Sequence, residues 1–116
     1  MYGKPDHINE RFTGIGRVRK DYSGIAFRGS VFEKCFFDKC DFSGSDMRNV
    51  WFFDCEFKDC KFALALFDST YIQNTKFVDC DFDDAIRLGS GKIVIDTKST
   101  GVPLSFAPFK YTEYVR

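Results

Sequence analysis

The fold is decided by residues 35–59, which read CFFDK CDFSG SDMRN VWFFD CEFKD in blocks of five. The third residue of each block is large and apolar, and the first is small in most blocks. Outside this stretch the same two columns continue, the large one from Phe27 to Phe82 and the small one from Ile25 to Cys80. The chain is therefore built on an internal repeat of five residues. The large column comprises Phe27, Phe32, Phe37, Phe42, Met47, Phe52, Phe57, Phe62, Phe67, Ile72, Phe77 and Phe82.

A five-residue period matches neither the helical period of 3.6 nor the strand period of 2. Both columns can stay on one side only if the chain turns a corner in every repeat. A turn of about 90° per repeat closes after four repeats and places residue i beside residue i+20, at a strand spacing of roughly 4.8 Å. The columns therefore predict a square-sectioned β-solenoid with the large side chains inside.

The blocks at 55–59 (CEFKD) and 80–84 (CDFDD) resemble the repeat of the pentapeptide-repeat proteins, which reads small, polar, Leu or Phe, and two mostly polar residues. The resemblance covers residues 25–84, about half of the chain. It implies an all-β fold, a right-handed quadrilateral β-helix of about three coils. The departures are mild and comprise Met47, Ile72, Ile25 and Val50.

The segments on either side of the repeats lack the pattern. Because a solenoid exposes unpaired strand edges at both ends, these segments are expected to cap it. We predict an N-terminal cap at 1–24, the β-helix at 25–86, and a C-terminal extension at 87–116. Pro103 and Pro108 argue against a helix in this extension, which we expect to pack on the solenoid or on a second subunit.

The five cysteines all occupy the small inward column. Their C-x4-C spacings suggest metal ligands at first, but any five-residue repeat produces this spacing, and a metal site needs thiolates that converge on one point. Stacked Cys40, Cys60 and Cys80 would lie within disulfide range, although a reducing compartment disfavours a bridge. We therefore expect buried, reduced structural thiols, and no metal or cofactor.

No catalytic constellation is evident in the sequence. His7 is the only histidine, and the Gly89-Ser90-Gly91-Lys92 segment lacks the additional glycine that a phosphate-binding loop has five residues before its Gly-Lys pair. No apolar run approaches the roughly 20 residues of a membrane span, and no secretory signal is visible. The sequence thus favours a non-enzymatic cytoplasmic protein with no membrane contact.

Charge is balanced over the whole chain but not along it. Lys plus Arg and Asp plus Glu each number 17, so direct nucleic-acid binding is not expected. The repeat segment carries a net charge of −5 and its flanks +5. A candidate acidic surface on the last coil comprises Asp79, Asp81, Asp83 and Asp84.

Several apolar residues occupy outward positions of the repeat. A contiguous exposed apolar strip usually marks an interface or is covered by another segment. We expect either the tail from Leu104 to Tyr114 or a second copy, in a homodimer, to cover this strip. The candidate interaction surface comprises Val31, Phe36, Trp51, Phe53 and Tyr71.

The fold alone cannot select a function. The first hypothesis is a protein-protein interaction module with an unidentified protein partner. The family resemblance implies an alternative, because some members mimic duplex DNA, bind a type II topoisomerase such as gyrase and confer drug or toxin resistance. A further alternative is an immunity protein against a toxin.

Overall fold

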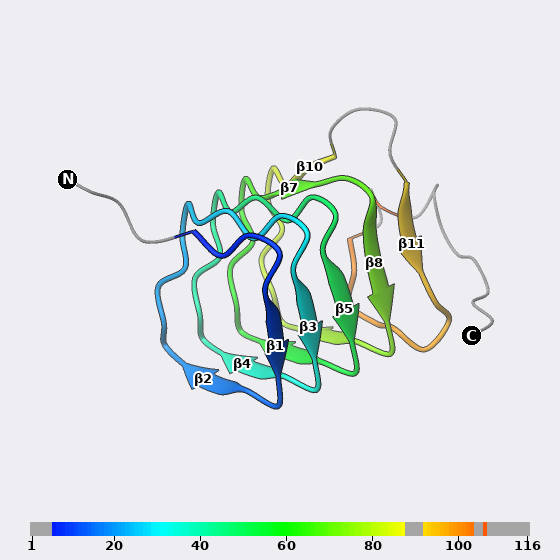
Figure 1. The fold of residues 1–116 in the computed structure, drawn as a ribbon, viewed down its shortest axis with the longest axis horizontal. Helices are drawn as coiled ribbons and strands as arrows, with labels where there is room; N and C mark the ends of the chain where they lie inside the picture. Colours follow the sequence, from blue (N-terminus) through cyan, green and yellow to red (C-terminus); the bar gives the residue numbers. More distant parts are fainter. Residues whose placement is uncertain (1–5, 88–91, 104–105, 107–116) are drawn as a thin grey trace.

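The computed structural model describes residues 6–87, 92–103 and 106. Within them the chain forms short strands joined by tight corners, without an α-helix (Figure 1). The strands are β1 Arg11–Thr13, β2 Gly16–Val18, β3 Val31–Glu33, β4 Phe36–Asp38, β5 Trp51–Phe53, β6 Glu56–Lys58, β7 Leu66–Phe67, β8 Thr70–Gln73, β9 Lys76–Val78, β10 Ile86–Arg87 and β11 Ile93–Ile95.

The strands stack coil upon coil into parallel sheets. One side of the solenoid is a five-stranded sheet in the order β1-β3-β5-β8-β11, and the next side is a four-stranded sheet in the order β2-β4-β6-β9. The two other sides are held by isolated bridges such as Asp41↔Lys61 and Ala26↔Asp46, and by the β7–β10 pair. Partners in the regular coils are 20 residues apart, as in Phe32↔Phe52, so the predicted quadrilateral β-helix is confirmed.

Each corner is made by a residue with positive φ, and these residues recur at every fifth position from Asn9 to Asp84. Glycine and asparagine tolerate this left-handed conformation best, and the remaining corners use mainly Asp, Lys or Ser. Four corners close one coil, so this run amounts to about four turns rather than the three predicted. The additional coil lies in the segment predicted as an N-terminal cap, where β1 and β2 continue the register of β3 and β4.

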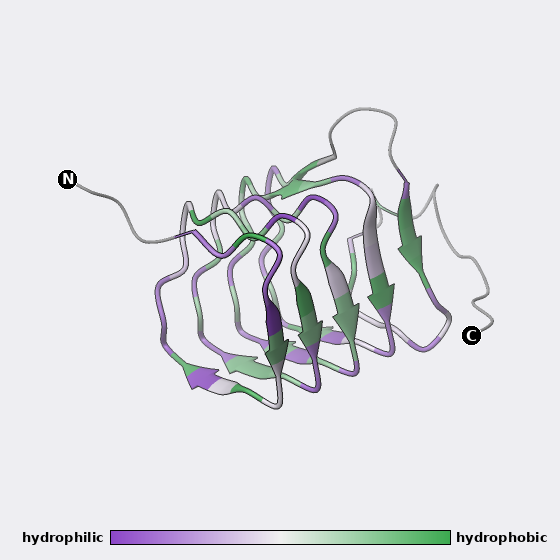
Figure 2. Ribbon diagram, in the orientation of Figure 1, coloured by the Kyte–Doolittle hydropathy of each residue, from purple (hydrophilic) through white to green (hydrophobic). Residues whose placement is uncertain are grey.

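The core consists of inward-facing side chains stacked along the solenoid axis. Phe37, Phe57 and Phe77 stack with centroids 5.1 Å apart at each step, and Phe42 and Phe62 stack at the same spacing. Hydrophobic residues concentrate on the strands, whereas corners are mostly hydrophilic (Figure 2). Because each buried Phe contributes about 1.5–3 kcal/mol, these stacks supply much of the stabilisation of a fold that has contacts only between adjacent coils.

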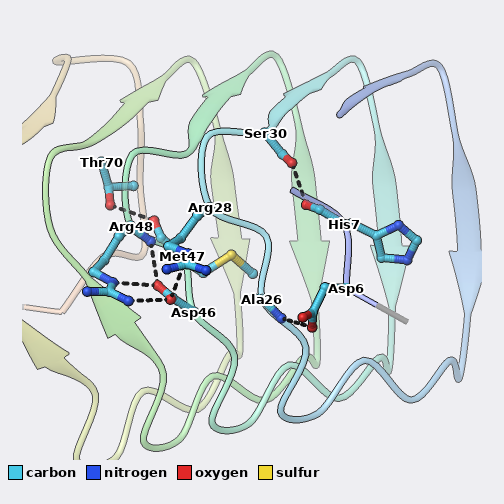
Figure 3. Close-up of polar contacts among 9 residues, drawn as sticks. All are labelled: Asp6, His7, Ala26, Arg28, Ser30, Asp46, Met47, Arg48 and Thr70. Atoms are coloured by element: carbon cyan, nitrogen blue, oxygen red, sulfur yellow. Dashed lines mark hydrogen bonds and ion pairs between the residues drawn. The ribbon is translucent and has the colours of Figure 1, made fainter. Parts of the chain in front are cut away.

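The small column is also buried, and most of its polar side chains form hydrogen bonds with backbone carbonyls. Most hydroxyls and thiols in this column donate a hydrogen bond to the carbonyl 23 residues earlier, in the preceding coil. The exceptions are the Thr75 hydroxyl, which donates to Gln73 O, and the Ser45 hydroxyl, which has no partner among the described residues. The Ser30 hydroxyl reaches His7 O at 2.8 Å and the Thr70 hydroxyl reaches Met47 O at 3.0 Å (Figure 3). The predicted burial is confirmed for four cysteines, whereas Cys80 is partly exposed. Equivalent thiol donors are Cys35, Cys40, Cys55, Cys60 and Cys80.

The C-terminal segment packs over the last coil. Strand β11 pairs with β8 at a spacing of 23 residues, which places Ile95 beside Ile72 in the core stack. Phe106 is 1% exposed and contacts the rings of Phe67 and Phe82, with centroids 5.0 and 5.9 Å away. This end of the apolar core is therefore covered by residues of the chain itself.

One outward side of the solenoid carries a small ion-pair network (Figure 3). The Arg48 guanidinium donates to both carboxylate oxygens of Asp46, at 2.8 and 2.6 Å, and Arg28 approaches the same carboxylate at 3.4 Å. Burial alone would raise the pKa of Asp46, but hydrogen bonds from Arg48 and the two positive charges outweigh it and lower that pKa. The network joins two consecutive coils.

Candidate interaction surface

The aromatic strip lies on the outer face of the five-stranded sheet. Val31, Trp51 and Tyr71 are register partners in β3, β5 and β8. Each directly precedes a core residue, and neighbouring residues of a strand face opposite ways, so their side chains point outward. The row continues to Arg11 in β1 and Val94 in β11.

Stacking of the coils brings the aromatic rings into contact. The rings of Trp51 and Tyr71 stack with centroids 4.1 Å apart and an interplanar angle of 18°. Phe53 lies beside Trp51, with ring centroids 5.6 Å apart. Trp51 is 38% exposed, whereas Val31, Phe53 and Tyr71 are half-buried. The result is a flat, partly exposed aromatic surface on a rigid sheet.

Phe36 does not belong to this face. It lies on β4 in the four-stranded sheet, around the corner made by Lys34, and is 41% exposed. The sequence pattern grouped it with the strip because the number of residues between positions does not show on which side of the square each position falls. A shallow groove of about 390 Å³ runs along this corner and is lined by Lys34, Cys35, Phe36, Asp54, Cys55, Glu56, Asn74 and Lys76.

Most of the tail expected to cover the strip, residues 104–105 and 107–114, lies outside the described residues. Phe106 is described, and it packs into the end of the core rather than on the strip. Val94 faces outward in the row of Trp51 and is nevertheless only 7% exposed. Coverage of the strip by the tail or by a second copy stays a prediction.

The four acidic residues are exposed on the last coil. Asp79 and Asp84 occupy corners, with φ of 53° and 56°. The Asp81 carboxylate accepts a hydrogen bond from the Asp83 amide at 2.8 Å, which fixes the turn between them. None of the four forms an ion pair with a described residue.

Two kinds of feature are absent from the described part of the chain. No group of three or more His, Cys, Asp or Glu side chains there could hold a metal ion. The same residues include no helix of the length and apolarity that crossing a bilayer requires.

A hollow at the N-terminal end, which we term the N-terminal mouth, was not predicted from the sequence. It is a cavity of about 140 Å³ between the first and second coils. Counting back from Phe27 in steps of five would have found its rim, because the same column continues there with Tyr22, Arg17, Phe12 and His7. The cavity is lined by His7, Phe12, Ile15, Arg17, Tyr22, Phe27, Phe32, Phe37 and Phe42.

Comparisons with known proteins support the fold. The family model for pentapeptide repeats matches residues 23–59 with eight copies. The full-length structure of QnrB1, a plasmid-mediated fluoroquinolone resistance protein, matches with 26% identity and a TM-score of 0.65 over 73% of this chain and 41% of that one. A trypsin-treated QnrB1 matches with 18% identity and a TM-score of 0.62 over 81% of this chain and 54% of that one.

The chain thus spans about half, or less, of these two QnrB1 chains. A pentapeptide repeat protein from the cyanobacterium Cyanothece, Rfr23, matches with 7% identity and a TM-score of 0.45 over 79% of this chain and 88% of that one. No curated protein matches the sequence significantly. The five-residue columns, the quadrilateral coils and the family match agree: the chain is a solenoid of pentapeptide repeats, of which the family model matches residues 23–59.

Proposed function

We propose that this chain is a non-enzymatic protein-binding module that docks its partner on the aromatic strip of Val31, Trp51, Phe53 and Tyr71. The observation that carries this proposal is the Trp51–Tyr71 stack, which stays partly exposed on the flat face of a rigid sheet. Aromatic side chains are enriched at interfaces because they bury a large surface at a low entropic cost. A partner that covers Trp51 gains this burial without reorganising the solenoid.

The groove beside the strip adds polar groups. It carries Lys34, Asp54, Glu56 and Lys76 next to the apolar side chain of Phe36. An apolar centre with a charged rim is the usual composition of a protein interface. This arrangement supports a protein partner, which includes a second copy of the chain.

The test compares Trp51→Glu with Leu64→Glu, because Leu64 is 56% exposed on another side of the solenoid. We expect Trp51→Glu to abolish partner capture from the native host, or to halve the mass in light scattering where the partner is a second copy. Leu64→Glu should change neither. If Trp51→Glu leaves both the captured proteins and the mass unchanged, the strip is not the docking surface.

A second candidate function is binding to a type II topoisomerase such as gyrase. Two observations favour it: the exposed carboxylates of Asp79, Asp81, Asp83 and Asp84, and the likeness to QnrB1, a fluoroquinolone resistance protein. A group of exposed carboxylates on one coil of a rod offers negative charge that a DNA-binding surface recognises.

This candidate has its own test. The purified protein should inhibit gyrase supercoiling or relieve quinolone poisoning, and replacing the four aspartates with lysine should abolish the effect. Trp51→Glu serves as the control that separates the two surfaces. An effect that survives the aspartate replacements would rule out the acidic surface, and no effect at high protein excess would leave the aromatic strip as the only supported docking surface.

A further inference from the structure

The first coil places polar side chains where the other coils place apolar ones. Arg17 is the register partner of Phe37, so its side chain leaves the backbone toward the solenoid axis. His7 holds the corresponding position above Phe27, and the two rings stack with centroids 5.5 Å apart. Arg17 is exposed, so its guanidinium is accessible to a ligand at the N-terminal end of the rod.

The space beside these residues is closed at the bottom by aromatic rings. The floor of the N-terminal mouth consists of Phe27, Phe32, Phe37 and Phe42, each at most 2% exposed. The volume of the cavity is about 140 Å³. A dry apolar cavity of roughly 150 Å³ holds one benzene ring. The mouth therefore fits a single six-membered aromatic ring, which would stack on or against the edges of the floor rings.

The rim of the mouth favours an anion. Arg17 donates one hydrogen bond to Gly16 O at 2.8 Å, but it makes no ion pair with any described residue. Tyr22 lies beside it, and burial raises the pKa of the Tyr22 phenol more than the neighbouring Arg17 lowers it. The phenol therefore stays protonated at neutral pH and can donate a hydrogen bond. A guanidinium and a phenol together match a carboxylate.

We propose that the N-terminal mouth binds a small aromatic carboxylate, with its ring on the phenylalanine floor and its carboxylate on the guanidinium of Arg17. A second copy docked mouth to mouth fits less well, because it would bring Arg17, Arg19 and Lys20 of both copies together. This site lies at the end of the rod, away from the aromatic strip, and does not depend on the function proposed for that strip.

The probe is phenylacetate, titrated into the full-length protein by calorimetry and by ligand-observed NMR. For a ligand with so few atoms we expect saturable binding with a dissociation constant of roughly 0.1–1 mM. Phenylacetamide keeps the ring and removes the charge, so it should bind about tenfold more weakly or worse. Raising the salt concentration should weaken binding of phenylacetate and leave phenylacetamide unaffected.

Arg17→Met removes the guanidinium and keeps an unbranched side chain, and Arg19→Met is its matched control on the outward corner of the same coil. We expect Arg17→Met to weaken phenylacetate binding at least about tenfold. Arg19→Met should leave the affinity within about twofold, and unchanged circular dichroism should show that both variants fold. Ile15→Phe, which fills the mouth without touching the charge, should also reduce binding.

Three outcomes would overturn the proposal. The first is the absence of saturable phenylacetate binding to the folded wild-type protein. The second is equal binding of phenylacetate and phenylacetamide, or equal binding by the wild type and Arg17→Met. The third is a protein whose mass doubles with concentration and returns to that of a monomer on Arg17→Met, because the mouth would then be occupied by a second copy.

Discussion

At the scale of single residues, Gly101 and Gly14 share a left-handed backbone but not an environment. Their φ angles are 82° and 67°. A Cβ atom on Gly101 would clash with the backbone carbonyl oxygen of Phe77, whereas a Cβ on Gly14 would meet no atom within 4 Å. At position 14, glycine is therefore favoured only by the left-handed backbone of a corner. At position 101, glycine is also required because two backbones approach closely where the C-terminal segment joins the solenoid.

These two glycines predict different costs for the same substitution. Gly14→Ala should lower the free energy of unfolding by about 1–2 kcal/mol, the penalty of placing Cβ in the left-handed region. Gly101→Ala should cost clearly more, because the segment from Ser99 to Val102 must move away from Phe77. Urea unfolding of both variants checks this. Equal losses of stability would contradict the close approach at Gly101.

Thr70 and Ser45 offer a second contrast in the small column. Both are fully buried, but the Thr70 hydroxyl donates to Met47 O while the Ser45 hydroxyl has no hydrogen-bond partner among the described residues. Thr70→Val should therefore destabilise the protein by about 1 kcal/mol or more, and Ser45→Ala should be close to neutral. Thermal unfolding followed by circular dichroism measures both. A larger loss for Ser45→Ala would show that its hydroxyl is satisfied.

At the scale of the coil, the repeating unit is a pair of inward residues with a corner between successive pairs. The large residue packs along the solenoid axis, and the small residue packs beside it. Where the small residue is Cys55 or Cys60, its thiol donates a hydrogen bond to a backbone carbonyl of the preceding coil. Cysteine suits the small position because it is compact, apolar enough to bury and still a weak donor. The five cysteines are thus explained by the geometry of the repeat.

This position in the coil should make three of the five thiols unreactive. Burial raises the pKa of Cys40. A hydrogen bond with a neighbouring thiol, and then burial, raise the pKa values of Cys55 and Cys60, and the same thiol pairs lower the pKa values of Cys35 and Cys80. The thiolate is the reactive species, so alkylation of Cys40, Cys55 and Cys60 should stay slow even at about pH 9, where an unfolded cysteine is largely ionised. Cys80, which is partly exposed, should react before them.

Mass spectrometry after timed iodoacetamide labelling identifies each modified residue. Denaturant should make all five cysteines react at similar rates, which serves as the control. Rapid labelling of Cys55 or Cys60 in native buffer would contradict their burial, and a cysteine that resists labelling in denaturant without reductant would indicate a disulfide.

At the scale of the whole molecule, the two ends of the rod are finished differently. The C-terminal end is closed by β11 and by Phe106. The N-terminal end is formed by a coil that keeps the register of the repeats. Its inward side chains are both polar and apolar, and they are partly exposed. This coil covers the large residues of the second coil and leaves the mouth open.

Removal of residues 1–24 tests the role of the first coil. It would uncover Phe27, Phe32, Phe37 and Phe42, which together bury enough apolar surface to contribute several kcal/mol. We expect self-association in light scattering and a lower melting temperature. Val18→Ser, at a position that is 56% exposed in the same coil, is the control and should change neither. A truncated chain that stays monomeric with an unchanged melting temperature would show that 1–24 is dispensable.

The sequence by itself determined the cross-section of this protein. Two columns with a period of five can both face inward only if the chain turns at every repeat. The quadrilateral path, the stacked Phe core and the burial of the small column therefore follow from the repeat itself. The outward direction of Trp51 follows in the same way, because it precedes the inward Phe52.

Only the tertiary structure decided how the ends are built and which outward residues share a face. The first coil repeats the geometry with residues that no longer match the pattern, such as Arg17, because a terminal coil has one neighbour and its inward positions need not be apolar. Phe36 and Phe53 lie on adjacent sides of the square, since a corner lies between their columns. β11 pairs with β8 after a longer connection, so the paired residues are 23 apart instead of 20. A repeat of five residues does not predict this spacing.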